Sequence, residues 1–585
     1  MTTNKTESLD YNRLVRASKR LSTHGTRQSI RLAILSDAAS QQFVPLLRTL
    51  FSESGVAAEV YEGAFDAIDL EALNPGSGLY AFRPDAIILA NCTQALRSRY
   101  YQHAQEGFVE VATERILHIW EALQTHSTAR IIQCNYPLPY ERQFGNYDLK
   151  MPDSLYAVTA ELNSRIALHA RERANVLICD VEAIASYIGR KDWFDERLWA
   201  MSKTFCRLDY LPHVAQALVQ IMLSSIGRVV KCVILDLDNT LWGGVVGDDG
   251  PFGIEIGPHG DGEAFHHFQQ YLLSLKKRGI LLAVCSKNNL ENALQPFLEN
   301  PDMVLKRDDI TVFVANWENK ADTIRAIRDT LQIGLDSMVF LDDNPFERNL
   351  VREFMPDVIV PELAEDPADY VRSICELNLF ETSSFSREDI ARTDLYRQEA
   401  SRRELQSSFT DINEFLKSLE MKIEVARFEP SKLVRIAQLI QRSNQFNLTT
   451  HRYSEADCEL MMQDETGCVP LYAHLSDRLG DHGLISVVIV RVKPAQLEIS
   501  DWLMSCRVLQ RGVEQLLMNR VVALAARMGR TRIRGTYVAT AKNGMVKDFY
   551  SQFGFEKVGE RDRSIEWHLD PAAYEPRNVH ITERA

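Results

Sequence analysis

VVKCVILDLDNT, residues 229–240, is an apolar run that ends in two carboxylates, Asp236 and Asp238. The apolar run predicts a buried strand, and open α/β sheets place their ligand sites at the carboxyl ends of strands. Two residues apart on an extended chain, the two side chains lie on the same side. Phosphoryl transfer through an aspartyl-phosphate needs a carboxylate nucleophile and a second carboxylate that handles protons. We therefore predict that Asp236 attacks and that Asp238 acts as general acid and then as general base.

The residues that follow supply the other groups that this chemistry needs. Predicted strands at 280–288, 310–316 and 337–344 extend the α/β unit, which we expect to cover residues 229–379. Thr240, Ser286 at a strand end and Lys320 can bind the phosphoryl oxygens. Hard carboxylate oxygens suit Mg²⁺, so the predicted metal ligands are four acidic residues, Asp236, Asp238, Asp342 and Asp343.

The order D-x-D-x-T, strand-end Ser, Lys and paired acids resembles the haloacid-dehalogenase superfamily. The resemblance implies a Rossmann-like phosphatase core. Between Asp236 and Ser286 there is room for a loop and one crossover helix, but not for an inserted cap domain. A core without a cap has an open site, which suits a phosphate carried on something large, such as a protein.

The bulk properties limit the class of protein. A chain of 585 residues is too long for one hydrophobic core, so several domains are expected. The net charge of −14 argues against a nucleic-acid partner. No CxxC pair occurs among the ten cysteines, the N-terminus is polar, and no apolar run is long enough to span a membrane. We therefore expect a cytoplasmic protein without a membrane partner.

Strands alternating with helices predict another parallel sheet over residues 29–228, after a tail or short docking helix at 1–28. This unit loosely resembles the SGNH hydrolases and is therefore expected to be flavodoxin-like. Asp37 takes the place of the nucleophilic serine, with Ser36 and Ser40 nearby. The third block of the family corresponds to Gly145 and Asn146, and the last one to Asp209 and His213. The departures predict a docking domain that does not hydrolyse.

A charged helical linker is predicted at 380–407, a strand-rich α+β domain at 408–570, and a tail at 571–585. FYSQFGFEKVGE, residues 549–560, resembles the closing helix and strand of a GNAT-type acyltransferase. In that fold a glycine-containing turn and a helix N-terminus bind the coenzyme A pyrophosphate. Here the turn reads RVLQRG, from Arg507 to Gly512, and Gln510 replaces its first glycine. This favours a carrier-borne phosphopantetheine, or no such ligand, over coenzyme A.

DLDNTLWGGVVGDDG and FLDDNPFER resemble the FkbH-like proteins, as do the later stretches SNQFNLTTHRY, DRLGDHGLIS and DWLMSCRVLQRGVE. The resemblance implies a role in polyketide-type biosynthesis. Such proteins take a glyceryl unit from 1,3-bisphosphoglycerate, remove its phosphate and load it as a thioester on an acyl carrier protein. The residues expected at the acyl or pantetheine site are Asn444, His482, Arg507, Arg511 and Gly512.

An acyl carrier needs a thiolate, and Cys506 precedes the turn between Arg507 and Arg511, whose charges should lower the pKa of its thiol. Cys506 is therefore a third candidate catalytic residue, with His451 and His482 as candidate bases. Two alternatives stay open. One is a Mg²⁺-dependent phosphatase of another phosphorylated molecule or carrier-bound acyl group, with flanking domains that only recruit. The other is a non-enzymatic adaptor.

Overall fold

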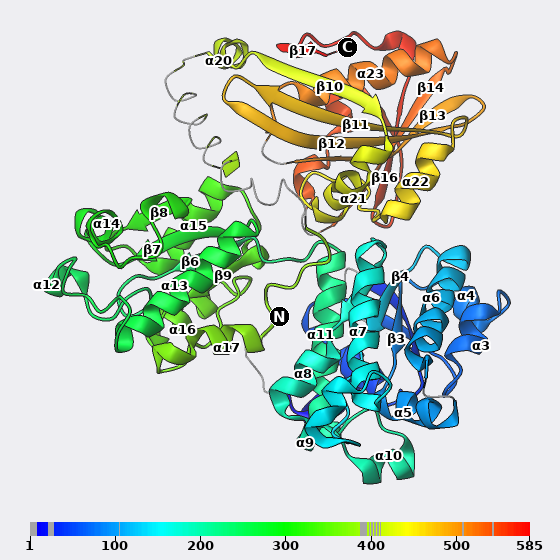
Figure 1. The fold of residues 1–585 in the computed structure, drawn as a ribbon. Coiled ribbons are helices and arrows are strands. Elements are labelled where there is room, and N and C mark those ends of the chain that lie inside the picture. The colour runs from blue at the N-terminus through cyan, green and yellow to red at the C-terminus, as the bar shows by residue number, and fades with distance from the viewer. Residues whose placement is uncertain are drawn as a thin grey trace. The chain divides into compact units, whose positions relative to one another are not determined.

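The computed structural model describes residues 9–21, 29–103, 106–385, 395, 396, 398, 402, 405, 409, 411–505, 508–540 and 543–584. Cys506, Arg507 and most of the predicted linker at 380–407 lie outside these residues. One compact unit ends at Ser225 and a second begins at Ile226. The described residues form three separate sheets, one in the first unit and two in the second (Figure 1).

The first sheet is parallel, with strand order β2-β1-β3-β4-β5. This is the flavodoxin-like order of a doubly wound fold, as predicted. β1 is buried along nearly its whole length because helices cover both faces. The main elements are β1 (Ser29–Ser36), α2 (Phe43–Glu53), β2 (Ala57–Glu62), α3 (Ile68–Leu73), α4 (Gly78–Phe82), β3 (Ala86–Ala90), α5 (Thr93–Gln102), α6 (Phe108–His126), β4 (Arg130–Cys134), α7 (Leu155–Arg171), β5 (Val176–Cys179), α8 (Val181–Ile188), α9 (Arg190–Trp193), α10 (Glu196–Ser202) and α11 (Leu211–Ser225).

The predicted tail at 1–28 contains a docked helix, α1 (Tyr11–Ser18). Its Leu14 is fully buried, and the carbonyl of Leu14 accepts a hydrogen bond from Thr49 of α2. The Asp10 side chain caps the helix. Of the two interpretations offered by the sequence, the short docking helix is the one that the described part of this segment supports.

The second sheet is parallel, with strand order β8-β7-β6-β9. Residues along β6 alternate between two apolar layers, with Val233 and Leu235 facing one and Ile234 the other. Between β6 and β7 the chain forms only loop, α12 and α13, so the core has no inserted cap domain. The elements are β6 (Cys232–Leu235), α12 (Val246–Asp249), α13 (Asp261–Lys277), β7 (Leu281–Ser286), α14 (Leu290–Glu299), β8 (Val312–Ala315), α15 (Lys320–Leu331), β9 (Met338–Leu341), α16 (Pro345–Phe354) and α17 (Tyr370–Glu376).

The third sheet is mixed, with strand order β15-β16-β14-β13-β12-β11-β10-β17. Its pairs are antiparallel except β13 with β14 and β10 with β17, and helices cover it, which gives the predicted α+β class. The main elements are α20 (Ile412–Ser418), β10 (Met421–Arg427), α21 (Leu433–Arg442), α22 (Glu455–Gln463), β11 (Cys468–Asp477), β12 (Gly480–Val492), β13 (Gln496–Met504), α23 (Val513–Arg527), β14 (Arg532–Val538), β15 (Glu556–Arg561), β16 (Ser564–Leu569) and β17 (Ile581–Glu583).

Two parts of this domain differ from the prediction. The segment predicted as a tail at 571–585 contains β17, which pairs with β10 and extends the sheet. The predicted closing helix before β15 is a short 3₁₀-helix, Tyr550–Phe553, which ends at Gly554 with φ +81°. A three-residue strand carries too short an alternation to be recognised from sequence, which is why β17 was missed.

Candidate active site

The predicted phosphatase residues gather at one edge of the second sheet. Asp236 follows β6, Ser286 ends β7, and Asp342 follows β9. Lys320 is the first residue of α15, directly after β8 and its loop. Because these strands are parallel, their carboxyl ends share an edge, and side chains far apart in the sequence meet there.

Three carboxylates form the centre of this site. Ligand oxygens of Asp236, Asp342 and Asp343 all lie within 4.8 Å of one another. Asp342 is fully buried, and the Oδ1 atom of Asp236 is buried without a hydrogen-bond partner among the described residues. Three carboxylates with one unsatisfied buried oxygen form a donor set that fits a hard divalent cation.

Lys320 is the cation that the chain itself supplies. Its Nζ lies 2.8 Å from Asp236 Oδ2 and 2.5 Å from Asp342 Oδ2, and only 3% of the side chain is exposed. Burial alone would lower the pKa of Lys320, but the two carboxylates raise it far above its usual range. Burial, and then the charge of Asp236, raise the pKa of Asp342 to about 6. One lysine therefore offsets only part of the negative charge, and a divalent cation would offset more.

The Asp238 carboxylate lies apart from this acidic group. Its Oδ1 accepts hydrogen bonds from the Trp242 indole (2.9 Å) and the backbone N–H of Val246 (3.0 Å). Its Oδ2 accepts one from the side chain of Asn288 (3.0 Å). Burial raises the pKa of Asp238, although the three hydrogen bonds oppose this change. The acid and base roles of Asp238 stay predictions, and its side chain is not part of the three-carboxylate group among the described residues.

Thr240 and Ser286 occupy different positions relative to the acidic group. The Thr240 hydroxyl donates to Asp343 Oδ1 and accepts from the Asp343 backbone N–H, both at 3.1 Å. Its hydroxyl thus orients Asp343. Ser286, 5% exposed, ends β7 as expected. The predicted phosphate-binding roles of Thr240, Ser286 and Lys320 stay predictions.

Two residues that the sequence analysis missed hold the site in shape. Asn288 is the donor to Asp238 described above. Arg348 of α16 donates to the carbonyl oxygens of Asp342 (2.8 Å) and Asp343 (2.6 Å), which fixes the turn after β9. Asn288 lies two residues after Ser286, and its polar side chain after a strand end was the available signal. Arg348 gave no such signal.

Magnesium binding at the acidic group is testable without any substrate. We expect saturating Mg²⁺ to raise the thermal unfolding midpoint of the wild type, since a ligand at about 100 times its Kd stabilises by about 2.7 kcal/mol. Asp343→Asn removes one donor and should lose most of this shift, whereas Asp322→Asn on the exposed face of α15 should keep it. Differential scanning fluorimetry at constant ionic strength measures the shift. Equal shifts in all three proteins would contradict a metal site here.

In the third domain, a side chain of α23 itself accepts a hydrogen bond from the turn that precedes this helix. Gln510 and Gly512 have φ of +61° and +90°, so Gln510 adopts the left-handed conformation that favours glycine. The backbone N–H of Gln510 donates to Glu514 Oε1 at 3.0 Å. The Glu514 side chain is buried in the first turn of the helix, and burial raises its pKa. The Glu514 side chain thus takes the backbone N–H of Gln510, and the preference for a carrier-borne phosphopantetheine over coenzyme A stays a prediction.

The other residues predicted at the acyl site are divided between two places. His482 is buried, with Nε2 2.9 Å from Asp477 Oδ2, and Arg402 and Arg511 lie against the same carboxylate. Burial and the two arginines lower the pKa of His482, although Asp477 opposes them. Asn444 accepts a hydrogen bond from Arg452. The roles predicted for Arg507 and Cys506 concern residues outside the described part of the chain.

In the first sheet, Asp37 stands at the end of β1, where the resemblance places a serine. It is 1% exposed and accepts hydrogen bonds from the backbone N–H of Cys92 (2.8 Å), the Asn91 amide (3.2 Å) and the Arg99 guanidinium (3.2 Å). Asn91 of the β3 end, not the expected Asn146, is therefore the asparagine beside position 37. Asn146 is exposed in a 3₁₀-helix. A carboxylate held by these donors cannot act as a hydroxyl nucleophile, and the docking role of this domain stays a prediction.

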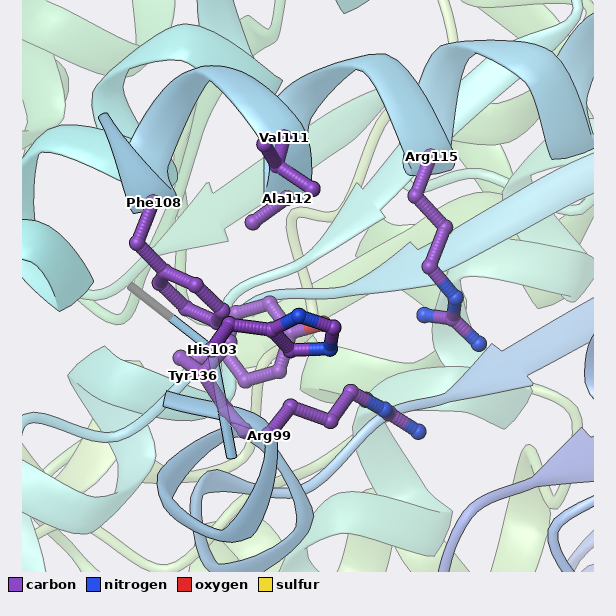
Figure 2. Close-up of a pocket in the computed structure, with 8 residues that line it drawn as sticks. Arg99, His103, Phe108, Val111, Ala112, Arg115 and Tyr136 are labelled. Carbon is purple, nitrogen blue, oxygen red and sulfur yellow. The ribbon is translucent and has the colours of Figure 1, made fainter. Parts of the chain in front are cut away.

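A small cavity of about 60 Å³ lies in the same domain, between α5 and α6. Figure 2 shows Phe108 and His103 at one side of it, with the Arg99 and Arg115 side chains extending at the other. Both arginines are paired, Arg99 with Asp37 and Arg115 with Asp69. The cavity is well below the volume of a typical small-molecule site.

None of the described helices combines the length and the apolar character needed to cross a membrane.

Comparison with known proteins gives a family match and a similar solved structure. Residues 31–223 match the model of the FkbH N-terminal domain. The crystal structure of the N-terminal part of BF1531 from Bacteroides fragilis, which contains a phosphatase domain complexed with Mg, is 40% identical. That alignment covers 64% of this chain and all of the relative, with a TM-score of 0.62. No match was found among curated proteins.

Distant matches fall on about a quarter of the chain. The GNAT domain of S. lividans PAT is 18% identical, with 25% of this chain and 89% of that chain covered and a TM-score of 0.21. A GNAT-family acetyltransferase from Streptococcus pneumoniae is 14% identical, with 25% and 98% covered and a TM-score of 0.22.

Proposed function

Since the chain belongs to the FkbH family, whose phosphatase core its second sheet forms, we propose that it is a bifunctional glyceryl transferase and phosphatase. It would take a glyceryl unit from 1,3-bisphosphoglycerate, remove the remaining phosphate and load glycerate as a thioester on an acyl carrier protein. Mg²⁺ is the cofactor of the phosphatase half. The observation that carries this half is the group of Asp236, Asp342 and Asp343 around Lys320 at one sheet edge.

In the phosphatase step, a carboxylate oxygen of Asp236 attacks phosphorus and the bond from phosphorus to the glyceryl oxygen breaks. Asp238 gives its proton to that oxygen, which leaves as a hydroxyl. Asp238 then takes a proton from water, the water oxygen attacks the aspartyl-phosphate, and inorganic phosphate is released. Lys320 offsets negative charge on Asp236 and the phosphoryl group. Mg²⁺, held by Asp236, Asp342 and Asp343, would supply further charge neutralisation there.

In the transfer step, the Cys506 thiolate attacks the acyl carbon of the acyl phosphate, and the bond to the phosphate oxygen breaks. The acyl group is then held as a thioester until a carrier thiol takes it. This half rests on the family resemblance of the third domain and on its strand, turn and helix before β14. The order of transfer and dephosphorylation is left open.

The whole scheme is tested by intact-mass spectrometry of a phosphopantetheinylated carrier protein incubated with this protein, Mg²⁺ and 1,3-bisphosphoglycerate. We expect the carrier mass to increase by one glyceryl group, because both steps act on the same substrate. An increase by phosphoglyceryl would mean that transfer precedes dephosphorylation. A carrier without its phosphopantetheine arm is the control and should gain no mass. Phosphate release without any carrier modification would contradict the transfer half.

A second candidate function is a Mg²⁺-dependent phosphatase of another phosphorylated small molecule or carrier-bound acyl group, with flanking domains that only recruit. The internal carboxylate of Glu514 at the α23 turn and the locked Asp37 favour this reading, since both sites lack the ligand chemistry of their fold relatives. Turnover of a phosphorylated small molecule at full rate without a carrier would support it.

A further inference from the structure

A histidine and a buried aspartate form a catalytic-type dyad in the third domain. The Nδ1 atom of His451 lies 2.8 Å from Asp501 Oδ1. Asp501 is 2% exposed on β13, whereas 57% of the His451 side chain is exposed. An ionised carboxylate only accepts hydrogen bonds, so Nδ1 carries the proton and donates it. The neutral ring then presents the Nε2 lone pair, which has no hydrogen-bond partner among the described residues.

The carboxylate is held ionised and fixed by two further donors. The Thr449 hydroxyl donates to Asp501 Oδ1 (2.6 Å), and the Tyr453 hydroxyl donates to Oδ2 (2.9 Å). Burial alone would raise the pKa of Asp501, but these donors and His451 outweigh it and lower the pKa. The Asp501 carboxylate in turn raises the pKa of His451 above its usual value near 6.5. Asp501 thus both orients the ring and stabilises its protonated form.

The loop that carries His451 is built to hold one conformation. Thr450, the residue before His451, is β-branched and has φ +62°, a left-handed conformation that is costly for such a residue. The Oδ1 atom of Asn447 accepts from the backbone N–H groups of Thr449 (3.3 Å) and Thr450 (2.7 Å). Asn447 is fully buried, and its carbonyl accepts from the Asn543 side chain. Strain of this kind persists where the surroundings impose it, and it concentrates at functional sites.

The other histidines of the described domain lack this combination. His482 is buried between Asp477 and two arginines, so no substrate atom reaches its paired nitrogen. His474 pairs through Nε2 with Asp481, whose side chain is 64% exposed, and His568 pairs with Glu566, which is partly exposed. Among the histidine–carboxylate pairs of the described residues, the pair of His451 and Asp501 joins a largely exposed ring to a buried carboxylate.

We propose that His451, positioned by Asp501, is the general base that deprotonates the thiol accepting the acyl group in the third domain. This inference rests on the acyl transfer proposed above and names its acid–base group. The thiol proton moves to Nε2, the thiolate sulfur forms a bond to the acyl carbon, and the bond from that carbon to its leaving group breaks. The imidazolium then returns the proton to the leaving group. The substrate class is a primary thiol, such as a phosphopantetheine arm.

The test is the rate of acyl transfer to the carrier, with hydrolysis of a small phosphomonoester measured separately as the readout of the phosphatase site. We expect His451→Gln to slow transfer by about 10²–10⁴-fold, the usual contribution of a general base, and to leave phosphomonoester hydrolysis within about two-fold. His474→Gln is the matched control, because it breaks a solvated histidine–aspartate pair of the same domain, and it should change neither rate. Tyr453→Phe keeps the dyad and should have a small effect.

The pH profile separates a base from a structural role. In the wild type, transfer should rise as pH increases through the raised pKa of His451, since the neutral ring is the active form. His451→Gln should lose this inflection. With a more acidic acceptor thiol, the difference in transfer rate between His451→Gln and the wild type should become smaller. The groups that also act on this region are Tyr453, Tyr550, Cys468, Arg491 and Asp457. Burial raises the pKa of the two tyrosines and of Cys468.

The outcomes distinguish the two proposals. Transfer by the wild type with equal transfer by His451→Gln would overturn the role of His451 and leave the transferase intact. No transfer by the wild type, with phosphate still released, would overturn the proposed transferase and this inference with it. If His451→Gln transferred the acyl group slowly but kept the pH inflection of the wild type, the role of His451 as base would also be overturned. The titrating group would then be another residue.

Discussion

Asp236→Asn is expected to slow phosphate release by at least about 10⁴-fold. An amide cannot attack phosphorus, and removal of a covalent nucleophile lowers rates by factors of that order. Asp236 contacts Lys320 through Oδ2, and its Oδ1 atom has no hydrogen-bond partner among the described residues, so this oxygen is available for attack. Release of inorganic phosphate from a phosphorylated substrate, followed continuously at saturating Mg²⁺, measures the loss.

The loss should not come from unfolding. In the metal-free protein, the amide removes one of three crowded negative charges, and Lys320 keeps its contact with Asp342. We therefore expect the thermal midpoint of Asp236→Asn to equal or exceed that of the wild type. Asp322→Asn, on the exposed face of α15, is the control with the same chemical change and should keep full activity. Phosphate release at the wild-type rate would show that the chemistry takes place elsewhere.

Lys320→Met is expected to destabilise the metal-free protein by about 3–5 kcal/mol, because it leaves buried carboxylates without their cation. The side chain is 3% exposed and contacts both Asp236 and Asp342. Loss of a fixed positive group beside the phosphoryl oxygens should also slow phosphate release by about 10²–10³-fold. Urea unfolding with and without Mg²⁺ measures the first effect, and Mg²⁺ should restore part of the stability.

Lys557→Met provides the matched comparison for this variant. Lys557 pairs with Glu560 at the surface, where the two side chains are 45% and 53% exposed, and exposed pairs contribute only about 0–1 kcal/mol. The two lysine variants should therefore differ by several kcal/mol, although each removes one ion pair. Similar stabilities for both would mean that the Asp236 and Asp342 carboxylates are protonated, or hydrated, in the absence of lysine.

Much of the phosphatase site follows from sequence because its residues lie at the ends of parallel strands. An apolar run with a polar residue at its end predicts both the strand and the sheet edge at which that residue lies, so the sequence alone predicts that Asp236, Ser286 and Asp342 lie together. The contacts across the site are another matter. Thr240 bonds to Asp343 over a hundred positions away, and local spacing carries no trace of such a pairing.

Burial also decides what the sequence leaves open. His451 and His482 are both candidate bases from sequence, because the sequence alone cannot place either ring in space. The fold buries His482 between two arginines, whereas it leaves His451 exposed beside the buried carboxylate of Asp501. Tertiary packing makes this distinction, and the local sequence does not. The same reason explains β17, which forms because β10 offers an edge and not because its three residues demand a strand.

The carboxylate at position 37 bears on how the first domain can change over time. Asp37 holds Arg99, Asn91 and the backbone of Cys92 in one network. A serine hydroxyl at that position would be too short to satisfy all three donors, although Arg99 would keep its contact with Asp66. The single substitution would therefore leave buried donors without their acceptor. The network acts as a ratchet on this position, because several coordinated changes would be needed before a hydroxyl could be accommodated there.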